Sequence, residues 1–133
     1  MMAAFWRSCM ASKHVLIGNT FPLTLVRGHR VTVEEIAPER FRAETVGAEV
    51  CSFWGHANSR AEAAAVAGVD LAPREERPVV TLDGAGYPVL AGRRFRACYV
   101  LSPDRAGAMV RSGEEIPVEA IAAWHFLKLS WLD

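Results

Sequence analysis

The feature that most constrains this chain is a series of short apolar segments, each ended by residues that favour turns. Residues 14–17 and 79–82 are rich in β-branched side chains, and turn formers follow them at 18–19 and 83–86. Segments of this kind favour strands, and we expect residues 87–90 to pair back across the second turn. No apolar run approaches the ~20 residues that a membrane-spanning helix needs. The pattern therefore predicts a globular protein built around a sheet.

Other segments carry strand signals as well. Residues 23–26 and 31–33 flank a glycine-containing segment at 27–30, which predicts a hairpin. Residues 95–101 are rich in strand formers and predict a central strand. In the last segment apolar side chains alternate, with Leu127, Leu129 and Trp131 on one face and Phe126, Lys128 and Ser130 on the other, as in a closing strand.

The clearest helix signal runs from Asn58 or Ser59 to Ala67. Ser59 and Glu62 have the spacing of a capping box, and the interior of the segment is rich in alanine. Gly68 stands where a left-handed residue ends a helix. The small side chains of this segment predict close packing against a sheet.

A second principal helix is predicted to begin at Pro117, because proline suits the first helical position. Its buried stripe would consist of Val118, Ile121, Ala122 and Trp124. Residues 102–107 predict a loop before it. Pro38 fits the start of a further short helix that carries Phe41 and Arg42.

With 133 residues, of which 51% are hydrophobic, the chain has enough apolar surface for one core. We predict a single α+β domain over residues 13–133, with a mixed β-sheet and about two principal helices packed on it. Residues 1–12 lack a secretion-signal pattern and predict a disordered or docking tail. Cys9, Cys51 and Cys98 have no metal-binding spacing, which favours a reducing, cytoplasmic compartment.

Positive and negative charges balance over the whole chain but not along it. The formal net charge is zero, so stable binding of duplex DNA is not expected. Thirteen of the 15 cations are arginines, which favour forked contacts to phosphate or carboxylate, although a GC-rich coding bias gives the same excess. Between residues 84 and 103, Arg93, Arg94 and Arg96 occur with aromatic residues and without any carboxylate. The alternative is a solvated edge strand whose charges discourage aggregation.

His56 is the strongest candidate for a chemical role. It comes immediately before the predicted helix at 59–67, where unsatisfied amides attract anions. An imidazole there is suited to bind a phosphate or to protonate a leaving oxygen near neutral pH. The structural alternative is a helix cap or a packing residue.

The sequence shows no signature of a metal or cofactor site. His14, His29 and His125 do not stand four residues apart from one another or beside carboxylate or cysteine partners. The chain also lacks a P-loop, a G-x-G-x-x-G motif and a G-x-S-x-G motif. We therefore expect neither a metal nor a cofactor.

Four motifs occur in a characteristic order: Asn19-Thr20-Phe21 after a strand, a Ser-x-x-Gly-His turn at 52–56, Gly68-Val69, and Gly-x-x-Ile-x-x-Glu-x-Ile at 113–121. This order resembles the viral ring-nuclease anti-CRISPR family. The likeness covers residues 15–132, with extra residues near 85–92 and 105–110.

The resemblance implies an α+β homodimer, or a higher homo-oligomer, in the cytoplasm of an infected host cell. Its shared pocket would receive a cyclic oligoadenylate, the second messenger of type III CRISPR immunity. In that family the ribose 2′-hydroxyl attacks its own phosphate, the turn histidine protonates the leaving 5′-oxygen, and no metal takes part. The resemblance gives the acid role to His56.

The chain departs from this family at several positions. Met109 and Ser112 stand where the family has an Arg-x-x-Glu, and Pro22 stands where a serine often follows the Asn-x-Phe element. We therefore expect a viral anti-defence sponge that sequesters a cyclic oligonucleotide or a cyclic ADP-ribose isomer without efficient turnover. The alternatives are a metal-independent ring nuclease and a nucleic-acid or protein-binding module.

The predicted ligand-binding residues form two groups. One group follows the predicted strand at 14–17 or stands at the start of the predicted helix at 59–67, and the other comes from the basic region and the loop after it. The full set is Asn19, Thr20, Gly55, His56, Asn58, Ser59, Arg93, Arg94, Arg96 and Arg105.

Overall fold

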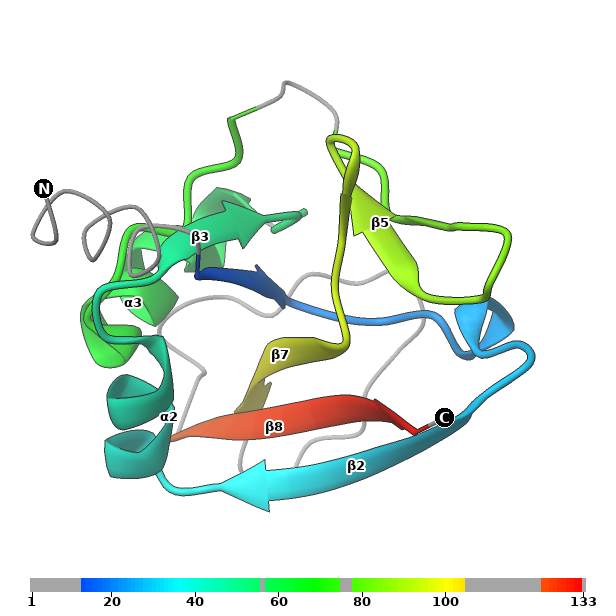
Figure 1. Ribbon diagram of the computed structural model, residues 1–133. Helices are drawn as coiled ribbons and strands as arrows, with labels where there is room; N and C mark the ends of the chain where they lie inside the picture. The colour runs from blue at the N-terminus through cyan, green and yellow to red at the C-terminus, as the bar shows by residue number, and fades with distance from the viewer. Residues whose placement is uncertain (1–12, 56, 75–77, 105–122, 133) are drawn as a thin grey trace, which may run out of the picture.

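The computed structural model describes residues 13–55, 57–74, 78–104 and 123–132 (Figure 1). Two α-helices, one 3-10 helix and eight strands form within these ranges. In chain order they are β1 (His14–Gly18), η1 (Leu23–Leu25), β2 (Arg30–Ile36), α2 (Pro38–Thr45), β3 (Glu49–Ser52), α3 (Ala57–Ala67), β4 (Thr81–Leu82), β5 (Pro88–Leu90), β6 (Arg93–Arg94), β7 (Ala97–Asp104) and β8 (Ala123–Leu132).

The strands form a five-stranded mixed sheet and a small antiparallel sheet. The larger sheet has the order β2-β8-β7-β1-β3, and the smaller one has the order β4-β5-β6. β1 runs parallel to both β3 and β7, whereas β8 is antiparallel to β7 and β2. With two helices beside a mixed sheet, the structure confirms the predicted α+β fold of one domain.

Alternate side chains of the large sheet enter two different cores. In β1, Val15 and Ile17 face the helices, while Leu16 faces the small sheet. On the helical side, Phe41 of α2 and Ala63 of α3 are completely buried in one core, so both helices cover the same face (Figure 1). The molecule therefore has three layers, with the large sheet between the helices and the small sheet.

α2 begins where the sequence predicts a short helix. Pro38 occupies its first turn, where a missing N–H costs nothing. Phe41 contacts the ring of Tyr99 edge-on, with 5.3 Å between the ring centroids. This aromatic contact fixes α2 on the sheet.

α3 confirms the predicted alanine-rich helix, with one change at its start. It begins at Ala57, so Ser59 is buried within the first turn and does not occupy the predicted N-cap position. Gly68 has a φ of 75°, as expected of a left-handed residue that ends a helix.

The first arm of the predicted hairpin is wrong. Residues 23–25 form the 3-10 turn η1, and Leu23 remains 81% exposed, so no apolar burial favours an extended strand there. The second arm lies inside β2, which pairs with β8 at the other end of the chain. This long-range partner replaces the local hairpin.

Two boundaries near the end of the chain also differ from the prediction. Residues 102–104 were expected in a loop, but they extend β7 because β8 begins early enough to pair with them. Trp124 was assigned to the second principal helix, yet it belongs to β8 and pairs with Pro103. The rest of that predicted helix lies outside the described residues. The alternation along β8 is confirmed, since Leu129 and Trp131 enter one core and Phe126 enters the other.

Candidate functional site

The parallel strands β1 and β3 end side by side and bring two predicted site residues together. The Oδ1 atom of Asn19 accepts a hydrogen bond from the backbone N–H of Gly55 at 2.9 Å. Thr20 is exposed beside them. His56 and the side chain of Asn58 lie outside the description, so the predicted acid role of His56 stays a prediction.

The predicted arginines lie at the other end of these strands. Arg93 contacts His14 and Glu49, which are the first residues of β1 and β3. A strand advances about 3.3 Å per residue, so His14, which Arg93 contacts, lies roughly 16 Å along the chain from Asn19. Within one chain the two predicted groups therefore do not form one site. Arg105 lies outside the described residues.

Arg93 belongs to an ion cluster around a single carboxylate. Both Arg93 and Arg74 contact Glu49, with 2.7 Å between Arg74 Nη1 and Glu49 Oε1. His14 Nδ1 lies 2.6 Å from Glu49 Oε2. Hydrogen bonds from Arg93 and then Arg74 lower the pKa of Glu49 to about 2. Two guanidinium groups thus share one carboxylate, which leaves local positive charge uncompensated.

Arg94 and Arg96 are arranged around Tyr87. Their guanidinium carbons lie 5.0 Å and 4.7 Å from the centroid of the Tyr87 ring. Arg94 also pairs with Asp83, whose pKa is lowered by the backbone N–H of Tyr87 and by Arg94. Arg93 and Arg94 form β6 at the edge of the small sheet, so the predicted edge position is confirmed for these two arginines.

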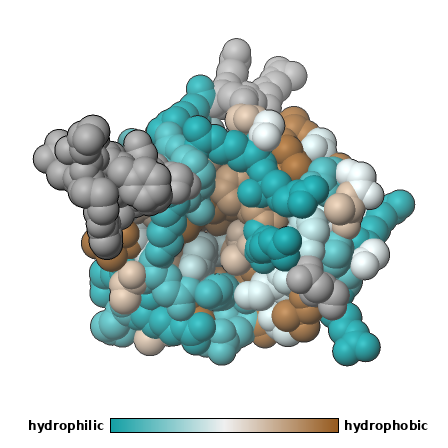
Figure 2. Space-filling view, viewed as in Figure 1, coloured by the Kyte–Doolittle hydropathy of each residue, from teal (hydrophilic) through white to brown (hydrophobic). Residues whose placement is uncertain are grey.

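Two adjoining hollows lie around these arginines. The larger one, which we call the basic cleft, has a volume of about 410 Å³ and is lined by Lys13, His14, Val15, Arg94, Phe95, Arg96, Ala97 and Tyr99. The smaller one, which we call the side pocket, has a volume of about 170 Å³ and is lined by Cys51, Ser52, Arg74, Pro78, Leu90, Ala91 and Arg93. His14 and Arg93 contact each other between the two. In Figure 2 hydrophilic side chains border a recessed, more apolar strip on this face.

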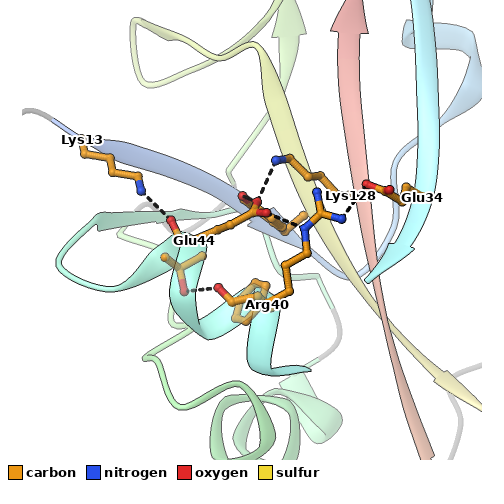
Figure 3. Close-up of polar contacts among 8 residues, drawn as sticks. Lys13, Glu34, Arg40, Glu44 and Lys128 are labelled. Atoms are coloured by element: carbon orange, nitrogen blue, oxygen red, sulfur yellow. Dashed lines mark hydrogen bonds and ion pairs between the residues drawn. The ribbon is translucent and has the colours of Figure 1, made fainter. Parts of the chain in front are cut away.

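One wall of the basic cleft is held by Glu44 of α2 (Figure 3). Its backbone oxygen accepts a hydrogen bond from Lys13 Nζ at 2.6 Å. Its carboxylate accepts bonds from Tyr99 Oη at 2.6 Å and from Lys128 Nζ at 2.7 Å. Arg40 Nε approaches the second carboxylate oxygen at 2.7 Å. Lys13 and Tyr99 are therefore positioned by contacts made before any ligand arrives.

Sequence reasoning missed part of this cluster. It gave His14 no role and did not single out Arg74 or Glu49. These residues meet because β1, β3 and β6 are placed beside one another by the fold. The only sequence signal was the run of arginines at 93–96 without a nearby carboxylate.

Two described residues at the hollows, Cys51 and Glu49, are not activated for covalent chemistry. Burial raises the pKa of the Cys51 thiol, which therefore is not activated as a nucleophile. Glu49 is ionised and acts only as an acceptor. Across the described part of the chain, no three His, Cys, Asp or Glu residues are grouped so that they could hold a metal ion. No described helix has the length and apolar character required to cross a membrane.

Comparison with known proteins gives one structural likeness to report. No protein-family model and no curated protein matches this chain. Among solved structures, the chain is similar to B116 of Sulfolobus turreted icosahedral virus, with 12% sequence identity and a TM-score of 0.48 over 90% of this chain and 99% of that chain. At these values the likeness assigns neither a family nor an activity.

Proposed function

We propose that this chain binds a small phosphorylated ligand of the cyclic-nucleotide class and sequesters it without efficient turnover. One observation carries the proposal: the two adjoining hollows are lined by five cationic side chains, Lys13, Arg74, Arg93, Arg94 and Arg96. Among the described residues, Arg74 and Arg93 share the single carboxylate of Glu49, and Arg94 pairs with Asp83. A site with this excess of cations favours a ligand with several negative charges.

The geometry suits phosphate groups on a compact ligand. Arginine forks bind phosphate oxygens through paired hydrogen bonds, and Lys13 adds a point charge on the opposite wall. The basic cleft lies within the usual size range of small-molecule sites, which is roughly 300–1,000 Å³. Phe95 and Tyr99 also line the cleft, but they are only 6% and 5% exposed, so their rings offer little surface for stacking. The charge of the cleft therefore carries the choice of a phosphorylated ligand.

Sequestration is favoured over cleavage because no pair of described groups here is activated for acid–base chemistry. The Tyr99 hydroxyl already donates a hydrogen bond to Glu44, and burial together with this bond raises the pKa of Tyr99. His14 is held between Glu49 and Arg93. The sequence departures at Met109 and Ser112 support the same choice, because they remove the Arg-x-x-Glu of the family that the motifs resemble.

The motif resemblance also supplies the biological setting of the proposal. It supports a viral protein that removes an immune second messenger from the cytoplasm of an infected host cell. A cyclic oligonucleotide or a cyclic ADP-ribose isomer fits the required chemistry, because each is a small ring with at least two negative charges.

The test is a capture-and-release assay. The protein is incubated separately with cyclic oligoadenylates, cyclic dinucleotides and cyclic ADP-ribose isomers, and the solution is chromatographed before and after heat denaturation. The proposal predicts stoichiometric loss of one ligand and its intact return on heating. Linear products before heating would identify a ring nuclease instead, and absence of uptake from every solution would overturn the proposal.

Two variants connect the assay to the hollows. Arg74→Ala and Arg96→Gln each remove one lining cation and are expected to weaken capture, whereas Arg27→Ala, an exposed arginine outside both hollows, should leave it unchanged. Binding of single-stranded or duplex DNA at low salt, with no uptake of small ligands, would favour the nucleic-acid-binding alternative.

A further inference from the structure

β2 is an edge strand whose surface is unusually exposed. It lies at one end of the sheet order β2-β8-β7-β1-β3 and pairs with β8, its single strand neighbour in the described structure. Figure 1 shows it as the outermost strand of the sheet. Of its seven residues only Ile36 is buried, and Val33 remains 60% exposed although it is apolar. An exposed apolar edge of this kind is a template for pairing with another strand.

The backbone groups that face outward from β2 follow from the bonds of β8. The N–H of Trp131 donates to the carbonyl of Arg96, so Trp131 directs its backbone groups toward β7. Backbone groups alternate in direction along an antiparallel strand, so Ser130 directs its groups toward its partner Thr32. Val31 and Val33 therefore direct their N–H and C=O groups away from β8, toward the outer edge of the sheet that the described strands form.

We propose that β2 pairs antiparallel with β2 of a second copy of this chain, centred on Thr32. A two-fold axis normal to the sheet keeps each side chain on its own face of the sheet. Two residues that face each other across this axis are therefore both even-numbered or both odd-numbered. Centring on Thr32 places Val31 opposite Val33 of the second copy and makes both of these hydrogen-bonded pairs. It also places Arg30 opposite Glu34 twice, once on each side of the axis.

The charged side chains favour this register over the next register that keeps each side chain on its own face. Centring on Val33 would place Val31 opposite Glu35 and Arg30 opposite Ile36, so neither carboxylate would meet a cation. In the Thr32 register the segment Arg-Val-Thr-Val-Glu at 30–34 is complementary to itself. Glu34 is 54% exposed and contacts Arg40 through Oε1, and a carboxylate has further acceptor positions for Arg30 of the second copy.

This dimer would leave the ligand sites independent of each other. β1, which lines the basic cleft, lies three strands from β2, or about 14 Å at the usual strand spacing. Each copy would therefore keep its own basic cleft, in contrast to the shared pocket that the motif resemblance implies. The proposal does not rest on the proposed function, because the two use different residues.

The direct test is a charge swap followed by sedimentation of the full chain over a wide range of concentration. The wild type should form a concentration-dependent dimer. Arg30→Glu and Glu34→Arg should each weaken it by about tenfold or more, because like charges would face each other, and the double variant should restore it. Glu39→Arg is the matched control, since it makes the same charge change on an exposed residue of α2 and should not affect the dimer.

A second measurement keeps the proposal testable if a swap disturbs folding. Val33→Lys changes an exposed side chain and should yield folded monomers. In the wild type, exchange of the Val31 and Val33 amide hydrogens should slow as concentration rises, while the Thr32 amide is protected at every concentration. A wild type that stays monomeric when concentrated, a dimer insensitive to both single swaps, or a double swap that does not restore the dimer would each overturn the proposal. Ligand capture by Val33→Lys should equal that of the wild type, which separates this outcome from the proposed function.

Discussion

At the scale of single residues, the Glu44 carboxylate is held by three side chains, Tyr99, Lys128 and Arg40 (Figure 3). Partial burial opposes its ionisation, but hydrogen bonds from Lys128, Tyr99 and Arg40 outweigh burial and lower its pKa to about 2. Because the folded pKa lies below the ordinary value of 4.5, the ionised group stabilises the fold above pH 4.5. That stability is lost as the pH falls from 4.5 toward 2.

We therefore predict that Glu44→Gln lowers the free energy of unfolding at pH 7 by on the order of 1–2 kcal/mol. This value is smaller than the energy equivalent of the full pKa shift, because solvent screens a partly exposed side chain. It should also reduce the loss of stability between pH 5 and pH 3. Urea denaturation at several pH values measures both effects. Glu39→Gln on the same helix is the control, and an unchanged pH dependence in Glu44→Gln would contradict the account.

Gly86 is a second residue whose identity the backbone requires. Its φ is 90°, and a Cβ atom there would lie 2.7 Å from the backbone oxygen of Arg27. Gly86→Ala should therefore lower the free energy of unfolding by about 1–3 kcal/mol, through backbone strain and this clash. Gly84→Ala in the same turn meets open space and provides the control. Equal thermal midpoints for the two variants would contradict this explanation.

The residues of the candidate site differ in how far the sequence predicted them. Asn19 and Gly55 are both predicted site residues, but no signal before Gly55 predicted β3, so their contact follows only from the pairing of β1 with β3. The convergence of Arg74 and Arg93 on Glu49 was not predictable either, because the three residues are distant along the chain and none belongs to a motif. Only the three-dimensional arrangement of β1, β3 and β6 places them together.

At the scale of elements, local signals predicted most strands and helices, and they also predicted the pairing of β4 with β5 across the turn at 83–86. They did not predict the strand partners in the large sheet. Pro38 and Gly68 marked a helix start and a helix end because each has a special backbone requirement. Residues 23–25 have strand-forming side chains but lack a burying partner, so they form a turn. Residues 102–104 carry turn signals, yet pairing with β8 makes them extended. Tertiary pairing outweighs local propensity in both cases.

Phe41 shows how strongly an element depends on one packed side chain. It is fully buried between α2 and the sheet and contacts the rings of Tyr99 and Phe126. Phe41→Ala should lower the free energy of unfolding by about 3–5 kcal/mol, because it leaves a cavity under the helix. Chemical denaturation monitored by circular dichroism measures the change. Val46→Ala, at a residue 75% exposed just after α2, is the control and should change the value by less than about 0.5 kcal/mol.

At the scale of the whole molecule, three layers place the cations of the small sheet beside the first residues of β1 and β3. The net charge of the sequence is zero and gives no sign of this local excess of cations. Part of the balancing negative charge, Glu34 and Glu35, lies on β2, three strands away from β1. Local excess charge predicts that ligand affinity falls as salt concentration rises. Titration of the captured ligand at low and high salt measures this dependence, and an affinity independent of salt would argue against phosphate recognition.

The claim that the cations of the two hollows bind the ligand is tested most directly by isothermal titration. The ligand identified by capture is titrated into the wild type and into the double variant Arg74→Ala, Arg96→Gln. The account predicts saturable binding by the wild type and an affinity at least about 100-fold lower in the folded double variant, because charge-assisted hydrogen bonds contribute roughly 1.5–3 kcal/mol each. Equal affinities for the two proteins would show that the ligand binds elsewhere and would contradict the account.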